Sequence, residues 1–137
     1  MRPFYESSED IQREQSVAAA AAIRWGCEAR KLPKAYQLDW AFFRGTLKAW
    51  CEIKCRNTAH AAYPTLLLSA HKWNDGLTFA ERFSVPFILL IKWRDGIRYW
   101  EVTDIKPEVQ VGGRKDRGDA QDIEPCVHLP KELFKQL

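Results

Sequence analysis

The sequence predicts an α/β domain with a central mixed sheet of four to five strands flanked by helices. Two helical patterns indicate this class: one contains five consecutive alanines, residues 18–22, and the other follows Ser69. Short runs rich in aromatic and apolar residues lie between and after these helices, and such runs are typical of strands. The predicted order is therefore helix, three strands, helix and two strands.

The first helix is predicted to begin at Ser7 or Ser8, either of which can cap its N-terminus, and to end near Gly26. At about 100° per residue, its apolar side chains fall in one stripe, and Glu14 falls in the same stripe. A carboxylate on the core-facing side of a helix is uncommon without a partner. Glu14 therefore either reaches solvent or an arginine from the edge of the stripe, or points over the sheet.

A strand over residues 27–32 and a hairpin over residues 36–44 and 47–56 follow the first helix. Gly45 favours a tight turn between the two arms of the hairpin, because glycine accepts a positive φ without steric cost. Both arms are rich in aromatic residues, as strands are. Residues 57–63 are expected to form a loop before the second helix.

Each arm of this hairpin contains a carboxylate, Asp39 in the first and Glu52 in the second. Alternate side chains of a strand share a face, so Glu52 and Lys54 point the same way while Cys51 and Ile53 point to the other. If Asp39 shares the face of Glu52, two carboxylates and one ammonium meet on one patch. Carboxylates in partly apolar surroundings repel each other unless a cation lies between them, and Mg²⁺ prefers oxygen ligands. A surface hairpin with solvated charges is the alternative.

The second half of the chain begins with the second helix. Its apolar residues recur at helical spacing after residue 70, and Gly76 inside the pattern indicates close packing against the sheet. Residues 86–93 form the most apolar predicted strand. Asp95-Gly96 is a hairpin-turn signal, and residues 97–102 return with the alternation of an exposed strand.

The composition changes after this strand. Residues 112–118 are basic and glycine-rich and are expected to form a loop. Residues 125–129 are predicted to add a short strand, and residues 131–137 a final helical turn.

Length and composition restrict the class of protein. With 137 residues, of which 46% are hydrophobic, the chain is expected to form one folded domain rather than a disordered tail. The net charge of +3 is compatible with nucleic-acid binding. No apolar run is long enough to span a bilayer and no signal-peptide pattern is present, so a cytoplasmic location is expected. The four cysteines contain no CxxC pair, which favours buried apolar roles over metal binding.

The hairpin also resembles a known family. Two segments resemble the core of the PD-(D/E)xK nuclease superfamily: Leu38-Asp39-Trp40-Ala41-Phe42 and Trp50-Cys51-Glu52-Ile53-Lys54-Cys55-Arg56. This superfamily includes restriction endonucleases, Holliday-junction resolvases and many phage nucleases. The resemblance spans roughly residues 14–102, and Leu38 stands where a proline usually precedes the aspartate. It implies a restriction-endonuclease-like core over about residues 7–102 within a single nuclease-like domain, residues 1–137.

The resemblance implies a site for Mg²⁺ or Mn²⁺. Asp39, Glu52 and the backbone carbonyl of Ile53 would bind the ion, and Glu14 would add a ligand directly or through water. Lys54 would position the attacking water or help to deprotonate it, and its charge would stabilise the transition state. The residues that the resemblance implies to be catalytic are Glu14, Asp39, Glu52 and Lys54.

Basic residues around this site are candidates for DNA binding. Lys72, at the start of the second helix, resembles a basic residue that several members place beside the site; a solvated lysine at a helix end is the alternative. Arg44 and Arg56 lie at the ends of the hairpin strands and could clamp the DNA backbone. Arg56 is favoured, because it continues the face of Glu52 by alternation. Three further candidates belong to the glycine-rich loop, where they could contact phosphates or be solvated: Arg114, Lys115 and Arg117.

The function implied is a metal-dependent nuclease that hydrolyses phosphodiester bonds in DNA, as a structure-specific or nicking endonuclease. A phage-encoded enzyme would act in the host cytoplasm. A homodimer is expected if both strands are cut, because one site cuts one strand. The alternative is a catalytically inactive nuclease-like domain that binds DNA or a protein partner. A third interpretation is a small structural subunit of a larger repair or packaging machine.

Overall fold

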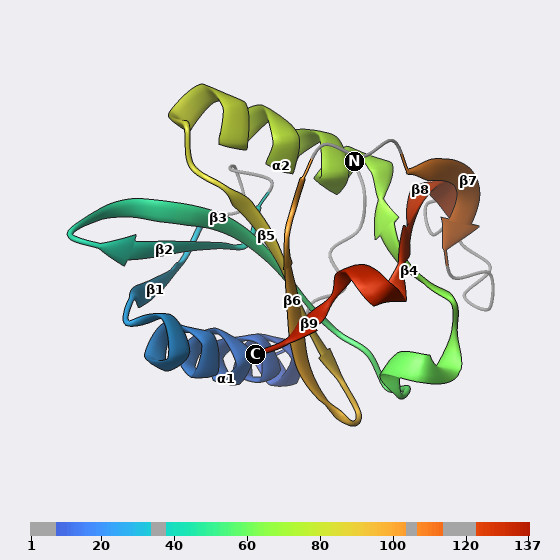
Figure 1. Cartoon of the computed structure of the whole chain (residues 1–137), viewed down its shortest axis with the longest axis horizontal. Helices are drawn as coiled ribbons and strands as arrows, with labels where there is room; N and C mark the ends of the chain where they lie inside the picture. The colour runs from blue at the N-terminus through green and yellow to red at the C-terminus, as the bar shows by residue number, and fades with distance from the viewer. Residues whose placement is uncertain (1–7, 34–37, 104–106, 114–122) are drawn as a thin grey trace.

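The computed structural model describes four stretches of the chain: residues 8–33, 38–103, 107–113 and 123–137. A six-stranded sheet lies between two helices, α1 (Ser8–Trp25) on one face and α2 (Ala70–Phe83) on the other (Figure 1). The predicted α/β architecture is confirmed, although the central sheet has six strands rather than four or five. Neither helix of the described residues has both the length and the apolar character that a membrane span requires.

The central sheet is mixed. In spatial order its strands are β1 (Glu28–Lys31), β2 (Trp40–Arg44), β3 (Thr46–Cys55), β5 (Phe87–Trp93), β6 (Gly96–Glu101) and β9 (Lys135–Gln136). β3 and β5 run parallel, and the other neighbouring pairs are antiparallel. The connection from β3 to β5 crosses over through α2, as a parallel pair requires. All five strands predicted for this sheet form, and β9 is the sixth.

A second, antiparallel sheet of three strands lies beside α2. In spatial order its strands are β4 (Thr65–Ser69), β8 (Ile123–Pro130) and β7 (Glu108–Gly113). The short strand expected at residues 125–129 is part of β8. β4 was not predicted, because its partner lies near the other end of the chain and no local turn joins the two. Before β4, the predicted loop over residues 57–63 contains a 3₁₀ turn, η2 (His60–Ala62).

The prediction of a glycine-rich loop over residues 112–118 is wrong for its first two residues. Gly112 and Gly113 belong to β7 and pair with residues of β8. Glycine is depleted in strands, so the composition favours a loop, whereas the pairing partner decides the structure. The remaining residues of that loop lie outside the described part of the chain.

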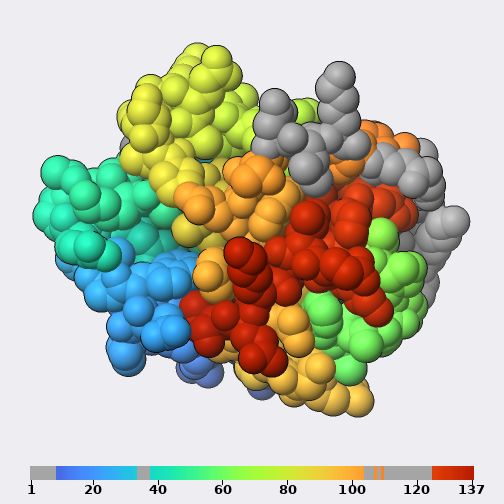
Figure 2. Space-filling view, in the orientation of Figure 1, coloured from blue at the N-terminus to red at the C-terminus, as the bar shows by residue number. Residues whose placement is uncertain are grey.

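The C-terminal segment differs from the helical turn predicted for residues 131–137. A 3₁₀ turn, η4 (Lys131–Leu133), is followed by β9. The N–H of Leu137 donates to the carbonyl of Ile97 at 3.1 Å, and Phe134 is buried in the core. Figure 2 shows this segment (red) lying across β6 (orange) on the surface. Pairing with the edge of the sheet therefore overrides a short helical pattern.

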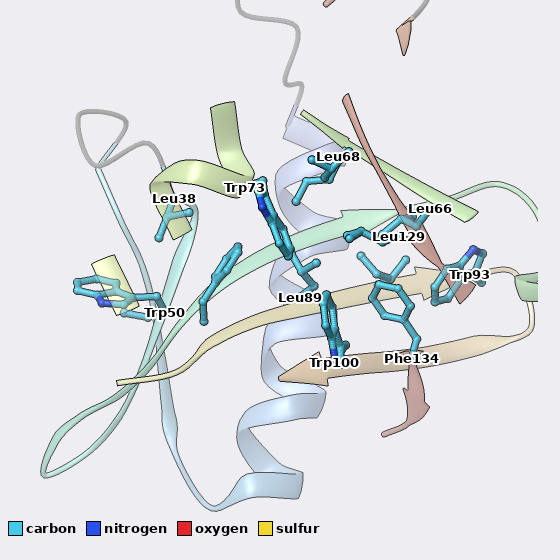
Figure 3. Packing of buried hydrophobic residues seen from close by; sticks show 14 residues of the cluster. Leu38, Trp50, Leu66, Leu68, Trp73, Leu89, Trp93, Trp100, Leu129 and Phe134 are labelled. Atoms are coloured by element: carbon cyan, nitrogen blue, oxygen red, sulfur yellow. The ribbon is translucent and has the colours of Figure 1, made fainter. Parts of the chain in front are cut away.

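Both faces of the central sheet are buried, so its inner strands are apolar on both sides. Trp50 and Leu89 point toward α2 (Figure 3), whereas Cys51 and Ile53 point toward α1. This alternation fixes the face on which each site residue lies. Glu52 follows Trp50 by alternation, lies on the α2 face and is 0% exposed.

α2 packs closely on the sheet at Gly76. A Cβ at this position would overlap the ring of Phe87, which is itself 1% exposed. The close packing expected from this glycine is therefore confirmed. Lys72 lies one helical turn before Gly76, so the same contact brings the start of α2 close to the sheet.

We expect Gly76→Ala to destabilise the protein by about 1–3 kcal/mol, because the added methyl group must displace a buried ring. Alanine is the better helix former, but the overlap outweighs that gain of about 1 kcal/mol. Asn74→Ala on the exposed side of the same helix is the matched control and should change stability by about 0.5 kcal/mol or less. Urea unfolding measures both, and a Gly76→Ala protein as stable as the wild type would contradict the close approach.

Candidate active site

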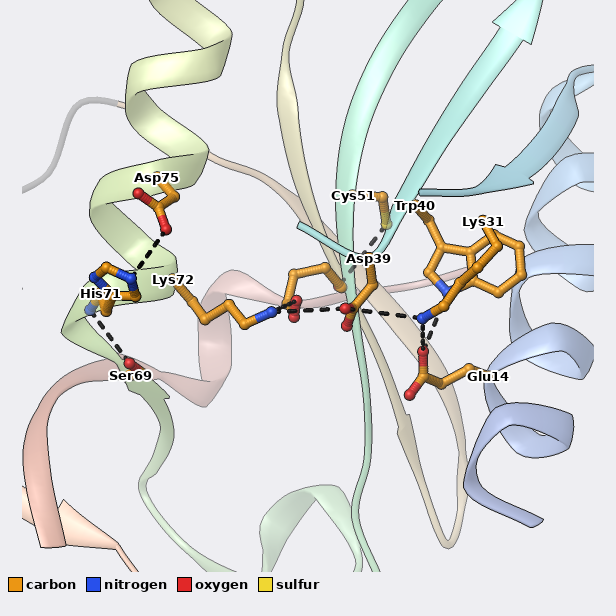
Figure 4. Close-up of polar contacts among 10 residues, drawn as sticks. Glu14, Lys31, Asp39, Trp40, Cys51, Ser69, His71, Lys72 and Asp75 are labelled. Atoms are coloured by element: carbon orange, nitrogen blue, oxygen red, sulfur yellow. Dashed lines mark hydrogen bonds and ion pairs between the residues drawn. The ribbon is translucent and has the colours of Figure 1, made fainter. Parts of the chain in front are cut away.

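Five charged side chains of alternating sign follow one another where α1, β1, β2, β3 and α2 meet (Figure 4). In order they are Glu14, Lys31, Asp39, Lys72 and Glu52, and we call them the charge line. Lys31 Nζ lies 3.3 Å from Glu14 Oε1 and 3.8 Å from Asp39 Oδ1. Lys72 Nζ lies 3.6 Å from Asp39 Oδ1 and 3.2 Å from Glu52 Oε1. Each carboxyl group in the line therefore has an ammonium group beside it.

Strand pairing places Asp39 beside Glu52. β2 and β3 are antiparallel and Trp40 pairs with Cys51, so Asp39, directly before β2, comes opposite Glu52. The backbone of Asp39 is held by the N–H of Leu32, which donates to the carbonyl of Asp39 at 2.8 Å. The two acidic side chains that the sequence predicted to meet thus come from neighbouring strands and share the α2 face.

Lys72 reaches this pair from the first turn of α2. The Ser69 side chain caps the helix by accepting the N–H of His71 at 3.2 Å (Figure 4). This cap fixes the start of α2 above the sheet. Burial alone would lower the pKa of Lys72, but the charges of Glu52 and Asp39 outweigh it, and the pKa is raised. Lys72 is therefore a firmly charged ammonium between two carboxyl groups.

Glu52 is the most buried member of the charge line. Among the described residues, no N–H or O–H donor makes a hydrogen bond of acceptable geometry to either oxygen of Glu52. Burial raises the pKa of Glu52 to about 8, and the charge of Asp39 adds to this, while Lys54 and Lys72 act in the opposite direction. Without a further cation, Glu52 therefore holds a proton at neutral pH.

Asp39 behaves in the opposite way. Burial alone would raise the pKa of Asp39, but its interaction with the neighbouring Glu52 and the charges of Lys72, Lys31 and Lys54 outweigh it, and the pKa is lowered. Asp39 is therefore ionised at neutral pH, whereas Glu52 holds a proton.

Lys54 and Glu14 lie on either side of this pair. Lys54 follows Glu52 by alternation and is half-buried, and within the described residues it forms no ion pair or hydrogen bond. Its charge nevertheless acts on both Asp39 and Glu52. Glu14 Oε1 accepts the indole N–H of Trp40 at 3.2 Å and pairs with Lys31. Glu14 thus points toward the site, but Lys31 lies between it and Asp39.

Lys31 was not predicted from the sequence. It is a single lysine in a four-residue, mostly exposed strand, and such a lysine carries no local signal of function. Its position follows from the pairing of β1 with β2, in which Lys31 lies opposite Trp40. The ammonium also lies 5.5 Å from the centre of the Trp40 ring, a cation–π distance.

The oxygen atoms of Asp39 and Glu52 suit a hard divalent ion. Such ions are usually held by one or two carboxylates together with substrate phosphates. Among the described residues, the buried oxygens of Glu52 accept no hydrogen bond of acceptable geometry, and the Lys72 ammonium is an ion-pair partner of Oε1. The side chain of Ile53 is buried toward α1, so only its backbone carbonyl could contribute. Within the described residues, no three His, Cys, Asp or Glu side chains are grouped as a metal site. The residues present therefore fit an ion that has two protein carboxylates as ligands.

The two arginines expected to clamp DNA both make contacts within the protein. Arg44 lies at the end of β2 remote from Asp39, and its guanidinium donates to the carbonyls of Trp25 at 2.8 Å and Gly26 at 3.3 Å. It thereby caps the C-terminus of α1. Arg56 donates to the carbonyl of Leu67 at 3.0 Å and so joins the end of β3 to β4. Burial lowers the pKa of Arg56.

The other residues expected to bind DNA differ in their placement. Lys72 lies inside the site rather than at its margin. The three basic residues of the glycine-rich loop lie outside the described part of the chain: Arg114, Lys115 and Arg117.

Comparison with known proteins agrees with the resemblance seen in the hairpin. The model of a family described as "Phage putative PDDEXK endonuclease" matches residues 1–137. The structure is similar to that of Hjc, a Holliday junction resolvase from the archaeal hyperthermophile Archaeoglobus fulgidus, with a TM-score of 0.53 and 22% sequence identity. That match covers 66% of this chain and 75% of the resolvase, and it shows a shared restriction-endonuclease-like fold. No curated protein matches the sequence.

The burial of Glu52 predicts that the metal-free protein loses stability as the pH rises. The folded protein keeps a proton on Glu52 up to a pH of about 8, whereas the unfolded chain releases it near 4.5. The resulting stabilisation is complete below the lower value and is lost as the pH rises through the upper one. We expect the melting temperature in EDTA to fall by roughly 10 °C between about pH 6 and pH 9.

Glu52→Gln should remove most of this pH dependence, because glutamine does not titrate. Glu101→Gln, at an exposed position of β6, is the matched control and should keep it. Thermal unfolding across the pH range measures both variants. The same slope in the wild type and in Glu52→Gln would show that Glu52 is not the titrating group.

The contacts of Arg44 predict a role in stability rather than in DNA binding. Arg44→Met removes the cap of α1 and should lower the melting temperature by roughly 2–4 °C. Its affinity for DNA should stay within about twofold of the wild type at matched salt. Arg24→Met, which removes an exposed charge from the last turn of the same helix, is the control. A large loss of DNA affinity for Arg44→Met alone would instead place DNA at this end of β2.

Proposed function

Because the chain belongs to the family of phage PD-(D/E)xK endonucleases, which are DNA-cleaving hydrolases, we propose that it is a divalent-metal-dependent DNA endonuclease. The observation that carries the proposal is the gathering of Asp39 and Glu52 on the α2 face, with Lys72 between them and Lys54 on the same face. We further propose that it acts as one nuclease-like domain, residues 1–137, on branched or nicked DNA in the host cytoplasm. Similarity of fold to a Holliday junction resolvase supports branched DNA as the first substrate to test.

Three groups would hold Mg²⁺ or Mn²⁺: the carboxylates of Asp39 and Glu52 and the backbone carbonyl of Ile53. When bound, such an ion lowers the pKa of a water molecule and neutralises charge on the phosphate. Asp39 is already ionised, and Glu52 would release its proton on binding. Glu14 would contribute through water, since Lys31 lies between it and Asp39.

The lysines would act on the water and the phosphate. Lys54 forms no ion pair within the described residues, so its ammonium is available to position the attacking water and to stabilise negative charge on the phosphate. In the hydrolysis, water forms the new bond to phosphorus and the bond from phosphorus to the 3′ oxygen breaks. The expected products are a 5′-phosphate and a 3′-hydroxyl. A homodimer would be needed to cut both strands at one place.

A domain that binds DNA or a protein without cutting is the second candidate. One observation favours it: the ammonium of Lys72 already lies beside both carboxyl groups. Such a site would be stable without any ion, and it would show no metal-dependent change in DNA.

We expect the protein to nick supercoiled plasmid and to cut four-way junctions with Mg²⁺ or Mn²⁺, and to do neither in EDTA. Lys54→Met should reduce the rate by about 100-fold or more, because it removes a charge that acts in the transition state. Lys92→Met is the matched control, since Lys92 lies exposed on the neighbouring strand β5, and it should cut at nearly the wild-type rate. Single-turnover rates on labelled DNA measure the difference.

Two outcomes would contradict the proposal. Cleavage that persists equally in Lys54→Met, Glu52→Gln and the wild type would indicate a contaminating nuclease. Absence of cleavage on every substrate with either ion, together with retained DNA binding, would favour the domain that binds without cutting.

A further inference from the structure

Lys72 lies where a cation between the two site carboxylates is expected. Its Nζ is 3.2 Å from Glu52 Oε1 and 3.6 Å from Asp39 Oδ1, and no other described ammonium contacts both side chains. The side chain of Glu52 is shielded from solvent at 0% exposed, whereas that of Lys72 is 28% exposed. The protein therefore supplies its own cation to the site.

The other charged groups around this position have different contacts. Lys31 reaches Asp39 at 3.8 Å from the β1 side and is shared with Glu14. Lys54 acts on both carboxyl groups through its charge, yet it forms no ion pair within the described residues. Of the lysines and arginines in the described stretches, only Lys72 bridges the pair, so Lys72 is the group that a second cation at the same oxygens would meet at short range.

We propose that Lys72 is a positioning residue that stands in for the divalent ion: its ammonium holds Asp39 and Glu52 together in the metal-free protein and moves away when the ion binds. This inference rests on the proposed metal-dependent function. Like charges at a few Å repel strongly where water is scarce, so the ammonium and a divalent ion cannot both occupy this position. The flexible four-carbon stem lets Nζ move while the backbone of Lys72 stays in α2.

The displaced ammonium of Lys72 can also bind substrate phosphate. Lys72 extends from the first turn of α2, which covers the face on which Asp39 and Glu52 lie. A phosphate that approaches the same carboxylates with an ion would meet this ammonium. One side chain would thus order the site before the ion arrives and bind substrate charge afterwards.

Mn²⁺ binding to the full chain, without DNA, tests the inference. Lys72→Met keeps the apolar stem and removes the competing charge, so its Kd for Mn²⁺ should fall by roughly tenfold from the wild-type value at pH 7.5. Lys92→Met removes an exposed charge from the neighbouring strand β5, and its Kd should change by about threefold or less. Electron paramagnetic resonance of free Mn²⁺ measures all three proteins. An unchanged or higher Kd for Lys72→Met, or an equal gain in affinity for Lys92→Met, would overturn the inference.

A measurement on the wild-type protein covers the case in which the variant fails to fold. Trace acetylation of lysines, read residue by residue by mass spectrometry, reports how accessible each amine is. Saturating Mg²⁺ should raise the labelling of Lys72 severalfold and leave that of the exposed Lys135 unchanged. Labelling of Lys72 that does not respond to Mg²⁺ would overturn the inference.

Neither measurement depends on cleavage, so failure of this inference and failure of the proposed function are distinguishable. Tighter Mn²⁺ binding by Lys72→Met with no DNA cleavage would support the stand-in role and contradict the nuclease. Metal-dependent cleavage by the wild type, with an unchanged Kd for Lys72→Met, would support the nuclease and contradict the stand-in role. If none of the three proteins binds Mn²⁺, both the stand-in role and the metal-dependent nuclease are contradicted.

Discussion

The complete burial of a carboxyl group at the centre of the sheet is the constraint on which the rest of the structure depends. Glu52 lies on β3, an inner strand that is covered by α1 on one face and by α2 on the other. An isolated carboxylate in such a place is strongly disfavoured. The fold lowers the free-energy cost of burying this group in two ways: Glu52 holds a proton, and the ammonium of Lys72 lies 3.2 Å from Glu52 Oε1. Neither partner belongs to the strand, so tertiary structure has to deliver them.

The connectivity of the fold brings these partners from three separate segments. The β2–β3 hairpin places Asp39 opposite Glu52 through strand register. The parallel pairing of β3 with β5 requires a crossover, and that crossover is α2, whose first turn delivers Lys72. The edge strand β1 adds Lys31 through its pairing with β2. The contact of Gly76 with Phe87 then sets how close α2 comes, so packing and electrostatics depend on the same helix position.

The features of this arrangement that could be predicted from the sequence are those that depend on local periodicity. Alternation along the hairpin correctly put Glu52 on the opposite face from Cys51, and the apolar pattern located both helices. Pairing between distant segments produces no local pattern in the sequence. For this reason β4 and β9 were not predicted, and two glycines of β7 were assigned to a loop. The place of Lys31 in the site and the helix-capping role of Arg44 were not predicted for the same reason, since both depend on elements that meet only in the folded chain.

The charges of the site also bear on how an ion and DNA would bind. The charge line and Lys54 together contain three carboxyl groups and three ammonium groups, so the site is close to neutral when every group is ionised. A lone divalent ion disturbs this balance, because it must displace both the proton on Glu52 and the ammonium of Lys72. An ion that arrives with a phosphate group adds positive and negative charge together, and the phosphate also gives the displaced ammonium a new partner. Ion and DNA would therefore strengthen each other's binding, and by reciprocity each should raise the affinity for the other by the same factor.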